Sequence, residues 1–197
     1  GRKPIQTYHQ PESHIFEVYA FLERQIAEGR QAYVVFPMIE ENEREEIRAL
    51  EEGLVRYRER FPEYTIVMVH GKMQPEKKDE EMRRFASGEA EIMLATTVIE
   101  VGVNVPNASV IVIEGANRFG LSQLHQLRGR VGRGASQSYC ILLTGNELGE
   151  DAKRRIAIMV ETNDGFEIAE EDMRLRGFGE IDGTRQSGQQ LSLRIAH

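Results

Sequence analysis

The sequence predicts an α/β protein built on a parallel sheet and followed by a helical appendage. Two observations support this prediction. Short, continuously apolar runs of strand length alternate with amphipathic helical segments through most of the chain, a pattern typical of parallel strands that helices cover on both faces. After Leu143 the strand-like runs stop and two helical segments follow. We interpret these last helices as an appendage packed on the sheet domain.

The first predicted helix and strand follow an N-terminal segment with a different character. Residues 1–12 hold two prolines and no apolar periodicity, so we predict an extended linker that arrives from an upstream region. From Ser13, apolar residues recur at helical spacing, and Ser13 and Gly29 suit the two ends of a helix. The apolar run 32–36 then predicts a strand that ends at Pro37.

The same alternation continues to the end of the sheet domain. A helix is predicted around Leu50, with apolar residues on one face and acidic residues on the other, and a second begins at Pro75, which suits a first helical position. The remaining predicted strands are 64–69, 92–95, 109–113 and 139–143, and the remaining helices are 121–130, 150–160 and 167–176. We therefore divide the chain into a linker (1–12), an α/β domain (13–146) and an appendage (147–197) that is truncated at its end.

Composition leaves the class of binding partner open. The chain is 40% hydrophobic and 29% charged, with a net charge of -7. That charge argues against a uniformly basic nucleic-acid-binding surface, but Arg128, Arg130 and Arg133 lie close together and could form a local basic patch. Cys140 is the one cysteine of the chain, which excludes an internal disulfide. It lies in an apolar run and is expected to be buried. No apolar run approaches the length of a membrane span.

Polar residues follow two of the predicted strands, where ligands bind in open parallel sheets. His70, Gly71 and Lys72 come after the second strand, and the tetrapeptide ending at Met73 is equally well explained as an ordinary turn. Thr96 and Thr97 end the next strand and could donate to phosphate oxygens, or Thr97 could simply cap a helix. Glu100 and Asn104 follow, and either could bind a ribose or an arginine.

The segment from Gln126 to Gly134 is the strongest candidate site. It interleaves three arginines with three glycines, and arginine binds phosphate through two parallel hydrogen bonds while remaining charged. Glycine weakens a helix and removes bulk that would hold a polyphosphate away. We therefore expect the helix to unwind here and to present a phosphate-binding loop rather than a solvated turn.

The chain lacks the other half of a nucleotide site. It contains no Gly-x-x-x-x-Gly-Lys-Ser/Thr phosphate loop, no paired acidic motif after a strand to hold Mg²⁺, and no His/Cys spacing typical of zinc. A chain with phosphate-binding arginines but no phosphate loop cannot complete a nucleoside triphosphatase site alone. The missing half must come from elsewhere.

The order of these motifs resembles the second RecA-like domain of superfamily-two helicases. Residues 95–109 are similar to helicase motif V, and residues 123–134 are similar to motif VI. Residues 177–188 resemble the translocation motif of the RecG family, which is shared in outline with the transcription-repair coupling factor. The Gly-Thr-Arg-Gln segment 183–186, the segment 36–41 and the opening 2–5 favour RecG over that relative.

The resemblance implies a role for each matching residue. Arg133 is implied as an arginine finger toward the γ-phosphate of ATP, with Arg130 as a second contact. Residues implied near the nucleotide are Gly102, Asn104 and Gln126. Residues implied at the DNA backbone are His70, Gly71, Lys72, Thr96 and Thr97. Residues implied in coupling are Glu100, Arg128, Gly183, Thr184, Arg185 and Gln186, with 177–188 as a helical hairpin and loop.

The same resemblance implies the setting of the whole protein. It would be a monomeric, cytoplasmic, nucleoid-associated bacterial helicase that shares ATP and Mg²⁺ with a first motor domain and remodels branched or duplex DNA with an N-terminal wedge domain. It would not bind a membrane. Asn104 stands where relatives commonly have Asp, and Asp182 where they tend to be apolar. Two alternatives remain: the matching domain of a transcription-repair coupling factor, and a non-catalytic module whose arginines dock an acidic partner.

Overall fold

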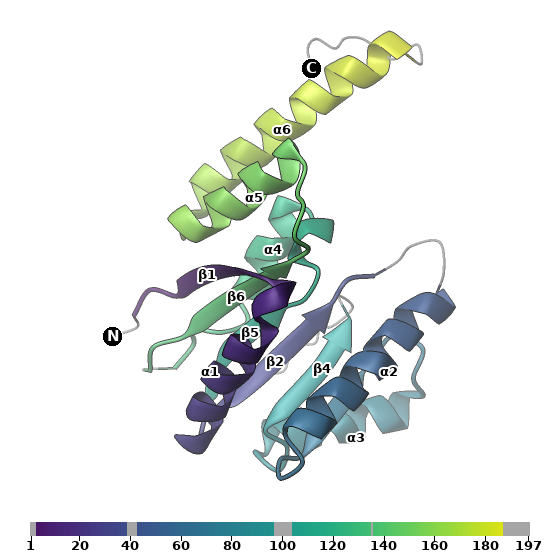
Figure 1. Cartoon of the computed structure of the whole chain (residues 1–197), viewed down its shortest axis with the longest axis vertical. Coiled ribbons are helices and arrows are strands. Elements are labelled where there is room, and N and C mark those ends of the chain that lie inside the picture. Colours follow the sequence, from purple (N-terminus) through teal and green to yellow (C-terminus); the bar gives the residue numbers. More distant parts are fainter. Residues whose placement is uncertain (1–2, 39–42, 97–103, 135, 187–197) are drawn as a thin grey trace.

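Six parallel strands form a single sheet (Figure 1). The computed structural model describes residues 3–38, 43–96, 104–134 and 136–186, and for residues 43 and 178–186 only the course of the backbone. The strand order is β1-β6-β5-β2-β4-β3, and every described pairing is parallel. The strands are β1 (Gln6–Pro11), β2 (Gln31–Phe36), β3 (Ile66–Val69), β4 (Ile92–Thr96), β5 (Ala108–Ile113) and β6 (Tyr139–Thr144). The predicted parallel α/β fold is confirmed.

Helices connect the strands and extend beyond the sheet. They are η1 (Glu12–His14), α1 (Ile15–Ala27), α2 (Glu43–Arg60), α3 (Pro75–Ala86), η2 (Ala116–Arg118), α4 (Leu121–Arg128), α5 (Glu150–Glu161) and α6 (Gly165–Gln186). Pro75 opens α3 as predicted, and Gly29 follows α1 with a φ of 93°. None of the described helices combines the length and apolarity needed to cross a membrane.

Alternate residues of strands β2 to β6 supply two separate cores. Val34 of β2 packs with Leu22 of α1 and Leu50 of α2 on one face. Tyr33 packs with Phe85 of α3 and Leu124 of α4 on the other face. The layers are therefore α1 and α2, the sheet, and then α3, α4 and the appendage, as expected for parallel strands buried on both sides.

The N-terminal segment is extended, but it is more than a linker. Residues 6–11 form β1, which pairs in parallel with β6 from Gln6↔Tyr139 to Pro11↔Thr144. Thr7 is the one buried residue of this strand. An edge strand with a single buried position shows no apolar alternation, which is why the sequence concealed it.

The appendage differs from the prediction at its end. The helical hairpin is formed by α5 and α6, joined by residues 162–164, and both helices pack against α4. Residues 177–186 continue α6 instead of forming a hairpin of their own. Glycine lowers helix stability by about 1 kcal/mol relative to alanine, but unlike proline it retains its N–H and does not interrupt the hydrogen bonds of a helix. The division of the chain into domains remains a prediction.

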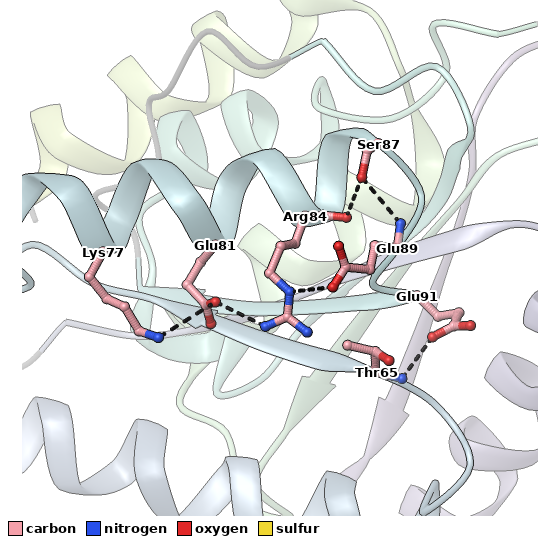
Figure 2. Close-up of polar contacts among 7 residues, drawn as sticks. All are labelled: Thr65, Lys77, Glu81, Arg84, Ser87, Glu89 and Glu91. Carbon is pink, nitrogen blue, oxygen red and sulfur yellow. Dashed lines mark hydrogen bonds and ion pairs between the residues drawn. The ribbon is translucent and has the colours of Figure 1, made fainter.

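Ion pairs fix the turn between α3 and β4 (Figure 2). Arg84 lies between two carboxylates, with its Nε 2.7 Å from Glu89 and a terminal nitrogen 3.2 Å from Glu81. The Ser87 hydroxyl donates to the Arg84 carbonyl and accepts from the Glu89 N–H, while Glu91 accepts from the Thr65 N–H. These contacts connect the end of α3 to the segments that lead into β3 and β4.

Candidate functional site

Most of the predicted site residues that the structure describes lie at the ends of β3 and β4 or in α4 and the loop that follows it. Because β3 and β4 are adjacent and parallel, with Val69 paired to Ala95, the carboxyl ends of the two strands lie side by side. Three of the predicted residues in this region, Thr97, Glu100 and Gly102, lie outside the described residues. Asn104 is exposed where the described chain resumes.

His70, Gly71 and Lys72 form a compact, mostly exposed turn. The Lys72 N–H donates to His70 Nδ1 at 3.2 Å, and the Met73 N–H donates to the His70 carbonyl at 3.3 Å. Partial burial lowers the pKa of His70, an effect opposed by nearby Glu51 and reinforced by Lys78. The turn therefore offers a neutral imidazole and a lysine at the edge of the sheet.

Thr96 does not lie where the DNA contact was expected. Its side chain is fully buried at the end of β4, opposite Phe36 of β2, and its hydroxyl has no hydrogen-bond partner in the part of the chain that the structure describes. A buried side chain cannot contact a DNA backbone, so that role is withdrawn for Thr96. The sequence located the threonine at a strand end but did not reveal which way it faces.

The loop after α4 is held closely on two sides. We call residues 129–134 the arginine loop. Gly132 has a φ of 86°, and a Cβ placed on it would lie 2.8 Å from Cγ1 of Ile5. A Cβ on Gly134 would lie 2.8 Å from the Pro106 carbonyl oxygen. Two glycines thus allow the backbone to approach the N-terminal segment and the segment before β5.

Arg130 and Arg133 stay with the arginine loop, as predicted. The helix ends at Arg128, so the loop is unwound, and Arg133 is exposed with its Nε 3.4 Å from the Gly129 carbonyl. Both positive charges act on buried Tyr33, where they oppose the rise in pKa that desolvation causes. Gln126 is exposed on the last turn of α4. The arrangement can present two guanidinium groups to a phosphate.

Arg128 does not belong to this basic patch. It is 2% exposed and donates to the Thr7 hydroxyl at 3.1 Å and to the Met159 carbonyl at 2.7 Å, with His125 Nδ1 at 3.4 Å. Burial lowers its pKa. Arg128 therefore joins α4 to β1 and to the last turn of α5. Its position four residues after buried Leu124, on the apolar face of α4, was the signal in the sequence.

Two other buried or clustered groups bear on chemistry. Cys140 is fully buried, as predicted, and burial raises the pKa of its thiol to about 12. Within the described ranges, no group of three or more His, Cys, Asp or Glu side chains could hold a metal ion.

The comparisons with known proteins identify the family. Residues 14–135 match the helicase conserved C-terminal domain, and residues 162–197 match domain 3, C-terminal, of ATP-dependent DNA helicase RecG. The chain belongs to the helicase C-terminal domain family. The second match covers α6 and the segment whose Gly-Thr-Arg-Gln sequence resembled RecG.

The relatives of this helicase domain are RecG proteins. It is 50% identical to the ATP-dependent DNA helicase RecG of Synechocystis over 95% of its length, and 46% identical to RecG of Bacillus subtilis over the same share. These alignments cover 23% and 28% of the two relatives. A solved structure of RecG bound to a three-way DNA junction is 42% identical over 91% of this chain and 23% of that chain, with a TM-score of 0.77. The chain thus spans about a quarter of the length of these relatives, and the predicted RecG resemblance is confirmed.

More distant structures share the fold. A domain 2 structure of the DEAD-box helicase Mss116p bound to an RNA duplex has a TM-score of 0.58 at 16% identity, covering 95% of this chain and 79% of that one. At that identity the likeness shows the fold alone, which is the RecA-like helicase fold.

We predict that Arg128→Ala destabilises the helicase domain. The substitution leaves the Thr7 hydroxyl and the Met159 carbonyl without their donor and opens a cavity, so we expect the free energy of unfolding to fall by about 2–4 kcal/mol. Urea denaturation followed by circular dichroism measures the change. Arg118→Ala, at an exposed arginine of η2, is the control and should change it by less than about 0.5 kcal/mol. Equal stability of the two variants would show that the buried hydrogen bonds of Arg128 contribute nothing.

Proposed function

We propose that this chain is the second motor domain of an ATP-dependent DNA helicase that remodels branched DNA in repair and recombination. The observation that carries the proposal is the arginine loop, held between Ile5 and Pro106 in a chain that matches RecG over 95% of its length and has no phosphate loop of its own. The alternative of a transcription-repair coupling factor is not favoured, because the relatives are RecG proteins.

In this proposal the domain supplies half of an ATP site. Arg133 reaches the γ-phosphate and Arg130 makes a second contact to it, while Gly102, Asn104 and Gln126 lie toward the rest of the nucleotide. The exposed position of Arg133 and the room left by the glycines of the loop suit an incoming polyphosphate. The phosphate loop and the ligands of Mg²⁺ belong to a first motor domain outside this chain. The role of the arginines is to offset negative charge as the terminal phosphate is transferred.

The DNA-facing surface lies at the carboxyl edge of β3. His70, Gly71 and Lys72 are proposed to contact the DNA backbone, together with Thr97. The exposed turn and its lysine suit a phosphate contact, which orients DNA without reading its sequence. The relative bound to a three-way junction supports branched DNA as the substrate, along with duplex DNA and the wedge domain as partners. We further propose that the whole protein is a monomer associated with the nucleoid in the bacterial cytoplasm.

Coupling is proposed to run from the arginine loop to the appendage. Arg128 adjoins the loop and binds the Met159 carbonyl at 2.7 Å, so the orientation of α5 depends on the helix that precedes the loop. Glu100 and the segment Gly183, Thr184, Arg185 and Gln186 are proposed to complete the connection. The backbone of that segment forms the last turn of α6.

We predict that Arg133→Ala in the full-length protein preserves ATP binding and abolishes most hydrolysis. Because an arginine finger contributes to the transition state rather than to the bound ground state, kcat should fall by about 10³–10⁵ with KM for ATP little changed. DNA-stimulated phosphate release measures kcat, and binding of a fluorescent nucleotide measures affinity. Arg118→Ala is the matched control. Near-normal turnover of the Arg133 variant would remove it from the finger role.

We predict that the purified 197-residue chain hydrolyses no ATP, with or without branched DNA. The physical reason is that no residue of this chain forms a phosphate loop to hold the nucleotide. Phosphate release above the rate of a chain carrying Arg133→Ala would contradict the proposal of a shared site.

We predict that Arg185→Ala in the full-length protein keeps DNA-stimulated ATPase activity within about twofold. It should reduce junction unwinding about tenfold or more, which corresponds to the loss of a coupling contact worth about 1.4 kcal/mol or more. The two rates are measured in parallel on a fluorescent junction. Arg176→Ala, which breaks the exposed ion pair with Asp172 in the same helix, should leave both unchanged. An equal loss of both rates in the Arg185 variant would contradict a coupling role.

A further inference from the structure

The side chain of Ile5 lies against the arginine loop at Gly132. Gly132 is separated from Ile5 by so little space that an ideal Cβ on the glycine would lie 2.8 Å from Cγ1 and 2.9 Å from Cδ1 of the isoleucine. Carbon atoms in van der Waals contact lie about 3.5–4.0 Å apart. The isoleucine side chain therefore occupies the space that a side chain at position 132 would fill, directly between Arg130 and Arg133 in the sequence.

Ile5 is itself held in place by hydrogen bonds from two side chains. Gln137 Nε2 donates to the Pro4 carbonyl at 2.6 Å, and Asn163 Nδ2 donates to the Ile5 carbonyl at 3.1 Å. The Gln6 N–H donates to the Ser138 carbonyl at 3.1 Å, at the start of the β1–β6 ladder. The segment is thus fastened to the chain that follows the arginine loop and to the turn between α5 and α6.

The far side of the arginine loop is also closed. Gly134 lies so near the Pro106 carbonyl that a Cβ on it would be 2.8 Å from that oxygen, and Val131 is buried. With Ile5 on one side and Pro106 on the other, the loop is confined between two backbone segments.

The space beside Ile5 is not filled by another side chain among the described residues. A cavity of about 280 Å³ adjoins it, lined by Lys3, Pro4, Ile5, His125, Arg128, Gly129, Gly132 and Asn163. Shortening the side chain would enlarge this space and leave the loop without support on that side.

We propose that Ile5 is a positioning residue for Arg133, which it holds in register for phosphoryl transfer by packing against Gly132. The inference rests on the proposed function, in which Arg133 acts on ATP and the chain before Ile5 leads to the first motor domain. Movement of that domain would then reach the arginine loop directly through residues 3–5, in addition to any route through DNA or the appendage.

A double-mutant cycle in the full-length protein tests the proposal. The variants are Ile5→Ala, Arg133→Ala and the combination, with DNA-stimulated kcat and KM for ATP measured for each. A displacement of about 1 Å in a catalytic group can cost about 100-fold in rate, so we expect Ile5→Ala to lower kcat about 10- to 100-fold with KM for ATP unchanged. In the Arg133→Ala background, where only the second contact from Arg130 is left to misplace, the fold loss in kcat caused by Ile5→Ala should be at least about fivefold smaller than in the parent.

Two further measurements separate positioning from loss of structure. Ile5→Ala should weaken binding of ADP with aluminium fluoride, an analogue of the transition state, by the same factor as kcat while leaving ADP binding unchanged. Ile15→Ala makes the same chemical change at a partly buried residue on the opposite core and should affect neither. Ile5→Val, which retains most of the contact, should keep kcat within about threefold of the parent, a difference of about 0.7 kcal/mol.

The outcomes are distinct. Equal fold losses from Ile5→Ala in both Arg133 backgrounds, a normal kcat in Ile5→Ala, or an equal loss in Ile15→Ala would each overturn the role of Ile5. Near-normal turnover of Arg133→Ala alone would overturn the proposed finger, and the inference with it. If Ile5→Ala does not fold, the cycle is run with Asn163→Ala, which removes the hydrogen bond to the Ile5 carbonyl, and the same non-additivity is expected.

Discussion

The guanidinium of Arg128 holds together the parts of this domain that the proposed function requires. It is buried with hydrogen bonds to a hydroxyl, a carbonyl and an imidazole, and a buried cation costs free energy unless its donors are satisfied. One acceptor, the Met159 carbonyl, lies in the last turn of α5, where carbonyls lack partners within the helix and the helix dipole is negative. A single side chain thus joins the edge strand, the helix before the arginine loop and the base of the appendage.

The sheet and most of its helices were predictable because burial on both faces leaves a clear pattern. Continuous apolar runs marked five of the six strands, and Pro75 and Gly29 marked helix ends through backbone preferences that act locally. The exception, β1, is an edge strand with Thr7 as its one buried residue, so its pairing with β6 depends on tertiary contacts that no local pattern encodes. The continuation of α6 through residues 177–186 was missed for a different reason. The glycines of this segment favour the end of a helix, but α6 continues through them.

The unwound loop after α4 was predictable from the sequence, but the direction of every side chain near it was not, and the roles of these residues remain predictions. Residue type predicted that Arg130 and Arg133 lie in an unwound loop, because the glycines between them weaken a helix. Thr96 was misjudged because a strand-end residue can face the interior or the solvent, and β4 is central enough to bury both faces. Arg128 was grouped with its neighbours by sequence distance, whereas its helical position after Leu124 turns it inward. Residue type suggests which side chains could bind phosphate, and packing determines which of them are exposed to a ligand.

The length of α6 has a mechanical implication. Its 22 residues, Gly165–Gln186, extend about 33 Å at the rise of an α-helix, and Figure 1 shows the helix projecting away from the sheet beyond α5. The helix is attached near its first turns, where Ile168 is buried and Glu171 pairs with Arg154 of α5. The helix is therefore anchored to α4 and α5 near its first turns, and any rotation there moves its C-terminal end. A tilt of about 10° at the base would displace the far end by about 6 Å, close to the length of one helical turn.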